Sequence, residues 1–211
     1  MNKDQAIKII GGNLSKVSKL PCYSYNIPAQ MCNVGSKLVN VKGSTCSGCY
    51  ALKGNYKRFP AIFKAMTRKL KAIKNKSWVQ ALAYLINSKR NNFFRWHDSG
   101  DLQSVEHLIK ISRVAKLTPK VNHWLPTREL NIVNSFYKKG YKRPSNLCIR
   151  ISAFLMNKAA KTVHDLPTST VHLKGSKVIG KECPAPKNKN QCGNCRSCWN
   201  DSIKNISYKY H

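Results

Sequence analysis

Between residues 61 and 151, short apolar runs alternate with stretches of helical periodicity, and this alternation is what most constrains the fold. The helical spacing of apolar residues predicts helices over 61–74, 78–89, 104–116 and 129–138. The apolar or alternating runs predict strands over 37–42, 93–96, 121–125 and 147–151. Strands that alternate with helices are typical of α/β folds, so we expect a largely parallel sheet, open or curled into a partial barrel.

The two ends of the chain lack this periodicity. The first 36 residues are rich in Gly, Pro, Ser and Cys, which predicts an irregular loop with little regular structure. After residue 151 the periodicity weakens. We therefore expect an α/β domain over residues 1–175, with the N-terminal cysteine-containing loop, and a cysteine-rich, metal-binding tail over residues 176–211 packed on it.

The C-terminal cysteines have the spacing of an iron–sulfur ligand set. A C-x2-C-x2-C run is formed by Cys192, Cys195 and Cys198, and Cys183 precedes a proline just upstream. Bacterial ferredoxins hold a [4Fe–4S] cluster with this spacing. Structural zinc sites usually show two C-x2-C pairs separated by a longer loop, so the spacing favours iron and sulfide over zinc, which stays the alternative.

A second group of cysteines, Cys22, Cys32, Cys46 and Cys49, lies near the N-terminus. Three arrangements are open. Cys32, Cys46 and Cys49 could hold a second [4Fe–4S] cluster with one iron open to S-adenosylmethionine. Cys22 could instead complete that set as a fourth ligand. All four could instead form a zinc knot, or Cys46 and Cys49 could join the C-terminal cysteines around one metal. The ninth cysteine, Cys148, lies in a predicted strand and is expected to be a buried apolar residue.

Polar residues follow the predicted strands. In α/β folds the functional site lies at the carboxyl ends of the strands, so these residues are expected to meet there. The candidate catalytic residues are His97, Asp98, Asp101, Arg128 and Glu129. The candidate cofactor-binding residues are Ser99, Gly100, Thr127 and Ser152.

The same residues also fit ordinary loop chemistry. Asp98 or Ser99 could cap a turn, Gly100 could supply a positive φ, and Asp101 could lie near the start of the next helix. Arg128 could clamp a phosphate or carboxylate, with Glu129 as its partner or as a base. Alternatively, Thr127 caps a helix and Glu129 complements the dipole of that helix.

The charge balance points to a polyanionic partner. The chain has 38 Lys and Arg against 8 Asp and Glu, a net charge of +30, and no carboxylate lies between residues 5 and 97. Lys and Arg release counterions when they bind phosphates, so DNA or RNA is the expected partner. The alternative is a basic surface that binds nucleic acid without purpose.

The chain shows no membrane signal. No window approaches the roughly 18 consecutive apolar residues of a membrane span, and the N-terminus lacks the apolar core of a signal peptide. A cytoplasmic location is therefore expected. Because that compartment is reducing, the cysteines are expected to ligate metal rather than to form disulfides.

Several longer motifs resemble the phage "gene product 88" domain family. The likeness runs from about Lys19 to the C-terminus and rests on CSGCYALKGNY, FRWHDSGDLQSVEHL, HWLPTRE, LPTSTVH and a tail that begins CPAPK, contains CGNCRSCW and ends ISYKYH. The resemblance implies a phage or mobile-element origin, hence the host cytoplasm, and a shared cysteine framework, without an established reaction. More distantly, the chain is similar to radical S-adenosylmethionine proteins of phage, and that likeness implies Cys32, Cys46 and Cys49 as the cluster ligands.

The leading hypothesis is an iron–sulfur enzyme that acts on nucleic acid or a nucleotide, by chemistry similar to that of radical S-adenosylmethionine enzymes. One rival is a non-enzymatic, zinc-containing nucleic-acid-binding protein. The other is a metal-dependent nuclease that uses His97, Asp98 and Asp101, although a Mg²⁺ site usually takes more carboxylates.

Overall fold

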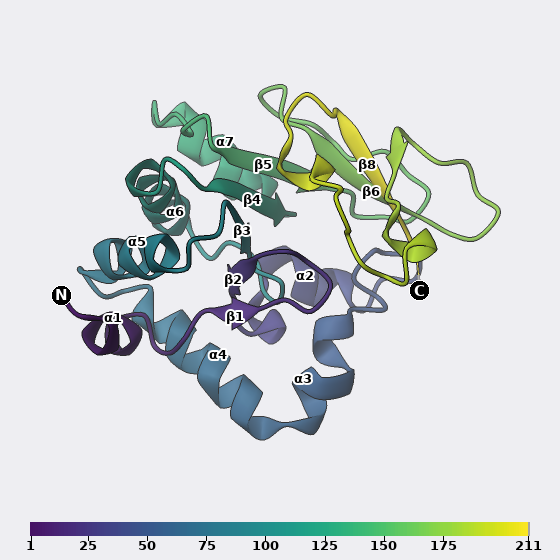
Figure 1. Ribbon diagram of the computed structural model, residues 1–211. Coiled ribbons are helices and arrows are strands. Elements are labelled where there is room, and N and C mark those ends of the chain that lie inside the picture. The colour runs from purple at the N-terminus through teal and green to yellow at the C-terminus, as the bar shows by residue number, and fades with distance from the viewer. Residues whose placement is uncertain (211) are drawn as a thin grey trace.

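The computed structural model describes residues 1–210, apart from the side chains of residues 55 and 57. It contains an open, eight-stranded sheet in the order β1-β2-β3-β4-β5-β6-β8-β7 (Figure 1). Neighbouring strands run parallel except β1 and β2, which are antiparallel. The strands are β1 Ser15–Lys16, β2 Tyr23–Tyr25, β3 Phe93–Trp96, β4 Asn122–Thr127, β5 Leu147–Ser152, β6 Thr168–His172, β7 Lys181–Glu182 and β8 Asn205–Lys209.

One face of the sheet is covered by helices that pack side by side, namely α1 Lys3–Ile9, α5 Trp78–Ser88, α6 Val105–Leu117 and α7 Leu130–Lys138 (Figure 1). Alternate strand residues such as Phe94, Leu125 and Ile149 point into this interface, where they form the main hydrophobic core with Leu82 and Leu108. Successive side chains of a strand point to opposite faces, so the residues between them lie on the other face.

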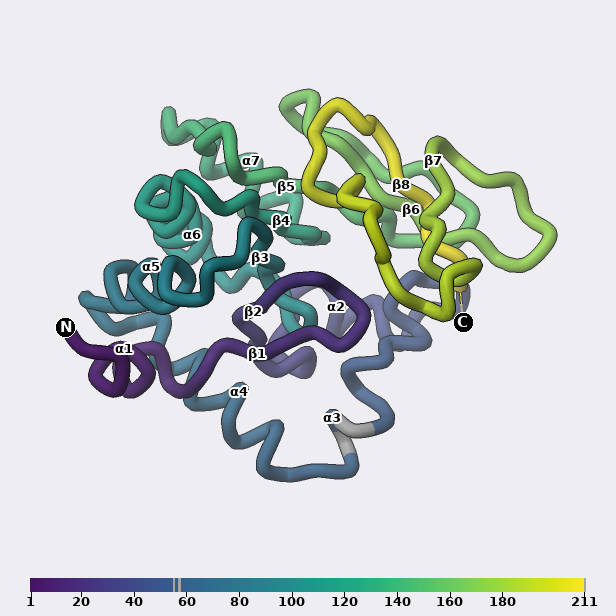
Figure 2. The backbone as a smooth tube through the Cα atoms, in the orientation of Figure 1, coloured from purple at the N-terminus to yellow at the C-terminus, as the bar shows by residue number. Residues whose placement is uncertain are grey.

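On that other face, a smaller apolar cluster contains Cys22, Trp124, Cys198, Trp199 and Ile206. The remaining helices are α2 Asn33–Leu38, α3 Gly54–Arg58 and α4 Pro60–Ala72, with short 3₁₀ turns at Ala29–Met31, Tyr50–Leu52, Ala185–Lys187 and Ser197–Trp199. Helices α3 and α4 form a V that extends away from the body (Figure 2). No described helix is long and apolar enough to cross a membrane.

The α/β prediction is confirmed for the middle of the chain. Helices α4 to α7 and strands β3 to β5 match the predicted elements within about two residues. The predicted strand over 37–42 is wrong: Leu38 ends α2, the following residues form turns, and Val41 is exposed. The alternation of apolar and polar residues there has no neighbouring strand on which to bury its apolar side chains.

The expectation of an irregular loop over the first 36 residues is also wrong. This segment contains α1, β1 and β2, and a capping box between Asn2 and Gln5 begins α1. These elements were hidden because they are short and lie among turn-forming residues. The segment after residue 175 provides β7 and β8, and β8 pairs with β6 in the main sheet. The domain boundary at residue 175 stays a prediction.

Candidate functional site

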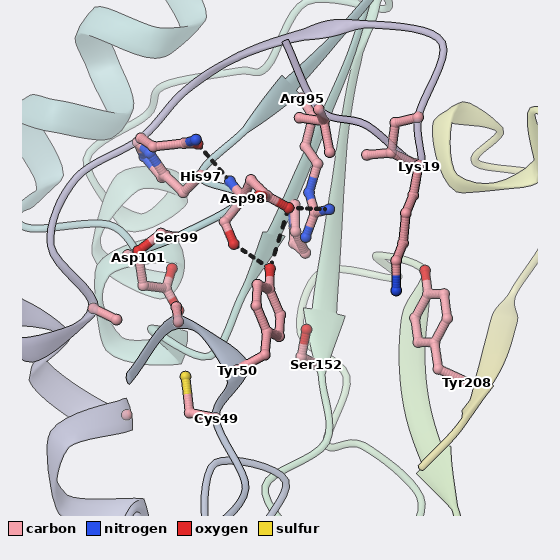
Figure 3. Close-up of a pocket in the computed structure, with 18 of the residues that line it drawn as sticks. Lys19, Cys49, Tyr50, Arg95, His97, Asp98, Ser99, Asp101, Ser152 and Tyr208 are labelled. Carbon is pink, nitrogen blue, oxygen red and sulfur yellow. Dashed lines mark hydrogen bonds and ion pairs between the residues drawn. The ribbon is translucent and has the colours of Figure 1, made fainter. Parts of the chain in front are cut away.

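A cavity of about 950 Å³ opens at the carboxyl ends of the parallel strands. Figure 3 shows part of its wall, with Arg95, Asp98 and Tyr50 joined by contacts and with Lys19 and Tyr208 on the facing side. Among the candidate residues, those that line it are Cys32, Cys46, Cys49, His97, Asp98, Ser99, Gly100, Asp101, Arg128, Ser152, Cys183, Cys192 and Cys198. Cys22, Thr127, Glu129 and Cys195 lie outside the lining.

Cys32, Cys46 and Cys49, which we call the strand-end cysteines, follow β2 in the chain. Cys32 precedes the first residue of α2, and Cys46 accepts a backbone hydrogen bond from Cys49 N at 3.0 Å in a tight turn. A Cβ atom on Gly35 would lie 3.6 Å from the Cys32 sulfur and 3.7 Å from the Cys46 sulfur. The bare glycine therefore leaves open the space that both sulfurs flank.

Thr45 and Arg128 fasten the Cys46 turn to the ends of β4 and β5. The Thr45 hydroxyl donates to Ala153 O at 2.7 Å and accepts from Arg128 Nε at 3.0 Å. Burial raises the pKa of the Cys46 thiol, and the Arg128 guanidinium acts in the opposite direction. Arg128 forms no ion pair within residues 1–210.

Asp98 fastens the segment after Cys49 to the end of β3. One carboxylate oxygen accepts from Arg95 at 2.8 Å and from the Tyr50 hydroxyl at 3.2 Å, and the other accepts from the Tyr56 hydroxyl at 2.8 Å. Tyr50 is the next residue after Cys49, and Tyr56 lies in α3. These contacts give Asp98 a positioning role for the cysteine loop.

Glu129 and Asp101 hold the neighbouring segments. Glu129 does not cap its own helix; its carboxylate accepts from Val34 N at 2.9 Å, two residues after Cys32. Asp101 accepts from the Thr127 hydroxyl at 2.6 Å, Arg128 N at 2.9 Å and Leu102 N at 2.7 Å, which joins the β3 and β4 loops. Burial raises the pKa of both carboxyls, and these hydrogen bonds act to lower it.

His97 and Gly100 shape the turn after β3. The His97 ring is only 3% exposed, its Nδ1 lies 2.9 Å from Tyr25 O, and its Nε2 has no hydrogen-bond partner among the described residues. Burial lowers the pKa of His97 to about 4, so the ring is neutral near pH 7. Gly100 has φ +91°, and a Cβ there would lie 2.3 Å from an Ile27 side-chain carbon. Gly100 therefore serves the turn, as the loop interpretation expected.

The other three cofactor candidates differ in their contacts. Ser152 ends β5 and its hydroxyl accepts from Ser169 at 3.2 Å. The buried hydroxyl of Ser99 has no partner among the described residues, although Ser99 lines the cavity. Ser99 is thus free to bind a ligand, whereas Thr127 is committed to Asp101 and Glu129 N.

A second group, which we call the aromatic-side cysteines, gathers on the other wall. Cys22 packs in the same apolar cluster as Cys198 and Trp124, and Cys192 N donates to Lys19 O at 3.2 Å. The Cys198 sulfur lies 3.2 Å from the Tyr208 hydroxyl. The members of this group are Cys22, Cys183, Cys192, Cys195 and Cys198. Cys22 therefore lies with the C-terminal cysteines, not with the strand-end cysteines.

The thiols of this group differ in acidity. Burial is the main cause that raises the pKa of Cys22 and of Cys198 to about 12, and nearby cysteines act in the same direction. For Cys195 burial also acts to raise the pKa, but hydrogen bonds from Ser197 and the charges of Lys181 and Arg196 lower it overall. Metal ligation requires thiolates, so a bound cation would have to offset the burial of the others. All nine cysteines are free, and Cys148 is buried as expected.

Arg150 anchors this second wall and was missed by the sequence-based reasoning. Its side chain is 0% exposed and donates at 2.9 Å to Thr168 O, Ile203 O and Asn200 O, and at 3.4 Å to Ser197 O. A charged residue inside the apolar strand LCIRIS was the available signal. Lys69 was also missed, because its spacing carries no signal.

Within residues 1–210, no three His, Cys, Asp or Glu side chains converge closely enough to hold one metal ion. A four-iron cluster is wider than a single ion, so its ligands stand farther apart. Of the eight candidate ligands, Cys22, Cys46 and Cys198 are buried and the other five are partly exposed. The ligand roles of the cysteines stay predictions.

The comparison with curated proteins found no match, and the comparison with solved structures found none either. A family model described as Gene product 88 matches residues 2–201, which include both cysteine groups and the loops after β3, β4 and β5. Because the match covers nearly the whole sequence, the chain belongs to the gene product 88 family.

Proposed function

We propose that this protein is an iron–sulfur enzyme whose strand-end cysteines hold a [4Fe–4S] cluster and whose cavity binds S-adenosylmethionine together with a nucleotide or a segment of nucleic acid. The observation that carries the proposal is the position of Cys32, Cys46 and Cys49, which follow the first parallel strand and line a cavity of about 950 Å³. A set of three cysteine ligands leaves one iron open to a further ligand.

A cluster with an open iron supplies single electrons to the molecule that it binds. The protein would hold the cluster loops in place through Asp98, Asp101 and Glu129, whose carboxylates are occupied by these contacts. Arg128 lines the cavity with guanidinium donors beyond the one bound to Thr45 and would bind an anionic group of the ligand. Tyr50 and Tyr56 would shield the site from water.

Four of the aromatic-side cysteines would hold a second cluster. The C-x2-C-x2-C spacing supports it, and the surrounding rings of Trp124, Trp199 and Tyr208 would limit the access of water. This would make the segment that carries Cys183 to Cys198 a metal-binding tail.

The charges support a nucleic acid or nucleotide as the substrate. The cationic side chains that line the cavity are Lys16, Lys19, Lys69, Arg95, Arg128 and Lys209, whereas Asp98 and Asp101 are the acidic ones. On the outer face of α4, Lys64, Arg68 and Lys71 are exposed at helical spacing and form no ion pair within the described residues. Such a stripe suits phosphate contacts.

Metal analysis tests the proposal. Protein purified without oxygen should contain iron and sulfide and should absorb visible light. Cys46→Ala and Cys192→Ala should each remove the iron of one cluster, whereas Cys148→Ala, at a buried cysteine in β5, should remove none. A colourless protein with stoichiometric zinc would contradict the proposal, and so would loss of all iron in either single variant.

Binding across a salt series tests the partner. We expect affinity for single-stranded DNA or RNA to fall steeply as salt rises, and the paired change Lys64→Gln with Arg68→Gln to reduce the slope of log K against log salt by up to about 2. Weak binding that does not vary with salt would remove nucleic acid from the proposal.

A further inference from the structure

Lys69 is a buried lysine on the cavity side of α4. Its side chain is only 5% exposed, yet the residue lines the cavity. The amino group donates to the Ser15 hydroxyl at 3.2 Å and lies 5.6 Å from the centre of the Tyr25 ring. No carboxylate within residues 1–210 forms an ion pair with it. An ammonium group has three donors, so two are left for a ligand.

An ammonium without a carboxylate partner is costly to bury. Removal of a charge from water costs several kcal/mol by order-of-magnitude estimates unless a partner offsets it. Burial is the main cause that lowers the pKa of Lys69 to about 8, and the charge of Arg68 acts in the same direction. The lysine therefore retains its charge near pH 7 without a partner that would stabilise it. An apolar residue at this position would make the folded protein more stable.

The surroundings of the amino group are suited to an anion. Ser15 and Lys16 of β1 line the same part of the cavity, with Asn26 just after β2. Among the described residues, the acidic ones that line the cavity are Asp98 and Asp101, and they are occupied by Tyr56 and Thr127. An anionic group that entered beside Lys69 would meet cations and hydroxyl groups.

We propose that Lys69 binds the anionic oxygens of the cavity ligand, either the phosphate of a nucleotide or the carboxylate of S-adenosylmethionine. This inference deepens the proposed function, on which it rests for the identity of the ligand. The two faces of α4 would then have different roles. Lys69 contacts the ligand in the cavity, whereas Lys64 and Arg68 lie on the exposed face.

Calorimetry on the full chain tests it, with AMP, S-adenosylhomocysteine and adenosine as probes. Lys69→Met should weaken the binding of at least one of the two anionic probes tenfold or more and leave adenosine unchanged. Lys116→Met, which removes the same charge from an exposed position in the last turn of α6, should change none of the three. Loss of AMP binding alone identifies the phosphate, and loss of S-adenosylhomocysteine binding alone identifies the carboxylate.

Thermal unfolding supplies the second readout. Because Lys69→Met removes a buried charge without a partner, its melting temperature should equal or exceed that of the natural protein. Lys69→Gln, which can still hydrogen-bond to Ser15, should keep the fold and lose the anion preference. A fall in melting temperature for both variants would show a structural lysine and overturn the inference. Unchanged affinity for both anionic probes, or no binding of either by the natural protein, would also overturn it.

The outcome is separable from that of the metal analysis. Binding of AMP that depends on Lys69 in a protein without iron would overturn the enzyme proposal and retain the anion site. A protein with both clusters and no dependence on Lys69 would overturn only the anion site.

Discussion

The two cysteine groups are attached to the sheet in opposite ways. The strand-end cysteines are held by carboxylates, because Asp98 and Glu129 accept hydrogen bonds from Tyr56 and Val34 in the cysteine-bearing segment. The aromatic-side cysteines are held by a cation, because Arg150 donates to four backbone carbonyls, three of them in the segment that follows Cys195. One attachment places anions near the cavity, and the other places a cation inside the protein.

This difference teaches how a basic chain uses its few acids. Of the 8 acidic residues, Asp98, Asp101 and Glu129 fasten the loops around the strand-end cysteines. Backbone carbonyls and aromatic rings surround the second group, and Glu182 and Asp201 form ion pairs beside it with Lys187 and Arg143. We therefore expect the first attachment to respond to charge and pH, and the second to respond to packing.

Arg150→Met should have the largest effect. It removes the donors of four carbonyls in a buried setting, so the free energy of unfolding should fall by about 3–5 kcal/mol. Urea unfolding measures the loss, and hydrogen exchange should show it first in residues 197–203. The exposed Arg113→Met serves as the control and should change stability by less than about 0.5 kcal/mol. An equal loss of unfolding free energy in both variants would show that Arg150 does not anchor the second wall.

Acid should weaken the strand-end side. Burial lowers the pKa of His97 to about 4 and that of His107 well below its usual range, whereas both rings titrate near pH 6.5 in the unfolded chain. Their stabilising contribution is complete above pH 6.5 and is lost as the pH falls through the folded pKa. Each of the two rings should lower the free energy of unfolding by about 1.4 kcal/mol for each pH unit below 6.5.

Urea unfolding at pH 7.0, 6.0 and 5.5 measures that dependence. Asparagine tolerates the positive φ at position 97. In His97→Asn the free energy of unfolding should therefore change less with pH, by the contribution of one histidine. The exposed His164 also has a positive φ, and His164→Asn serves as the matched control for the substitution itself. Identical slopes in all three proteins would show that His97 is not buried neutral.

Glu129→Ala should cost less, roughly 1.5–3 kcal/mol, because one hydrogen bond to a charged acceptor is lost. Its specific readout is iron: the strand-end cluster should load poorly, and the second cluster should load normally. Glu129→Gln retains an oxygen that can accept from Val34 N and should restore most of the iron. Equal loss of iron from both groups would show that the carboxylates do not distinguish them.

Gly35→Ala should have the smallest effect on stability. Alanine favours the helix by up to about 1 kcal/mol, and the close approach of the new Cβ to the Cys32 Cβ, 3.0 Å, offsets that gain. The methyl group would still occupy the space beside both sulfurs, so iron at the strand-end cysteines should fall. Ser36→Ala, at the next and exposed position, should retain it. Full iron in Gly35→Ala would mean that the cluster does not use this space.

The sequence was informative where periodicity is long and failed where elements are short. The apolar runs of β3 and β5 and the helices between them were predicted because each buries a regular face. The three-residue strand β2 lies between turn-forming residues, and residues 37–42 alternate without a sheet beside them. Whether a segment forms a strand depends on pairing with distant strands, which the local pattern does not encode. That pairing is present for β2 and absent for residues 37–42.

For the site, the rule that functional residues lie at the carboxyl ends of strands identified loops that line the cavity. It did not show the contacts that these loops make. The chain itself supplies partners for Asp98 and Glu129, at Tyr56 and Val34, and sequence spacing does not show them. Lys69 is one cation among many in its segment, and only tertiary structure shows that it is buried. Cys22 is close to Cys32 in sequence, yet it packs with Cys198.

The contact between the start and the end of the chain has a consequence for folding in the cell. Cys192 N bonds to Lys19 O, and Cys22 packs against Cys198, across nearly the whole sequence. Contacts of such high sequence separation close late, and on a ribosome they must wait for the last strand to emerge. The strand-end cysteines can assemble while synthesis continues. If both groups hold the proposed clusters, the strand-end group would receive its metal first and the aromatic-side group second.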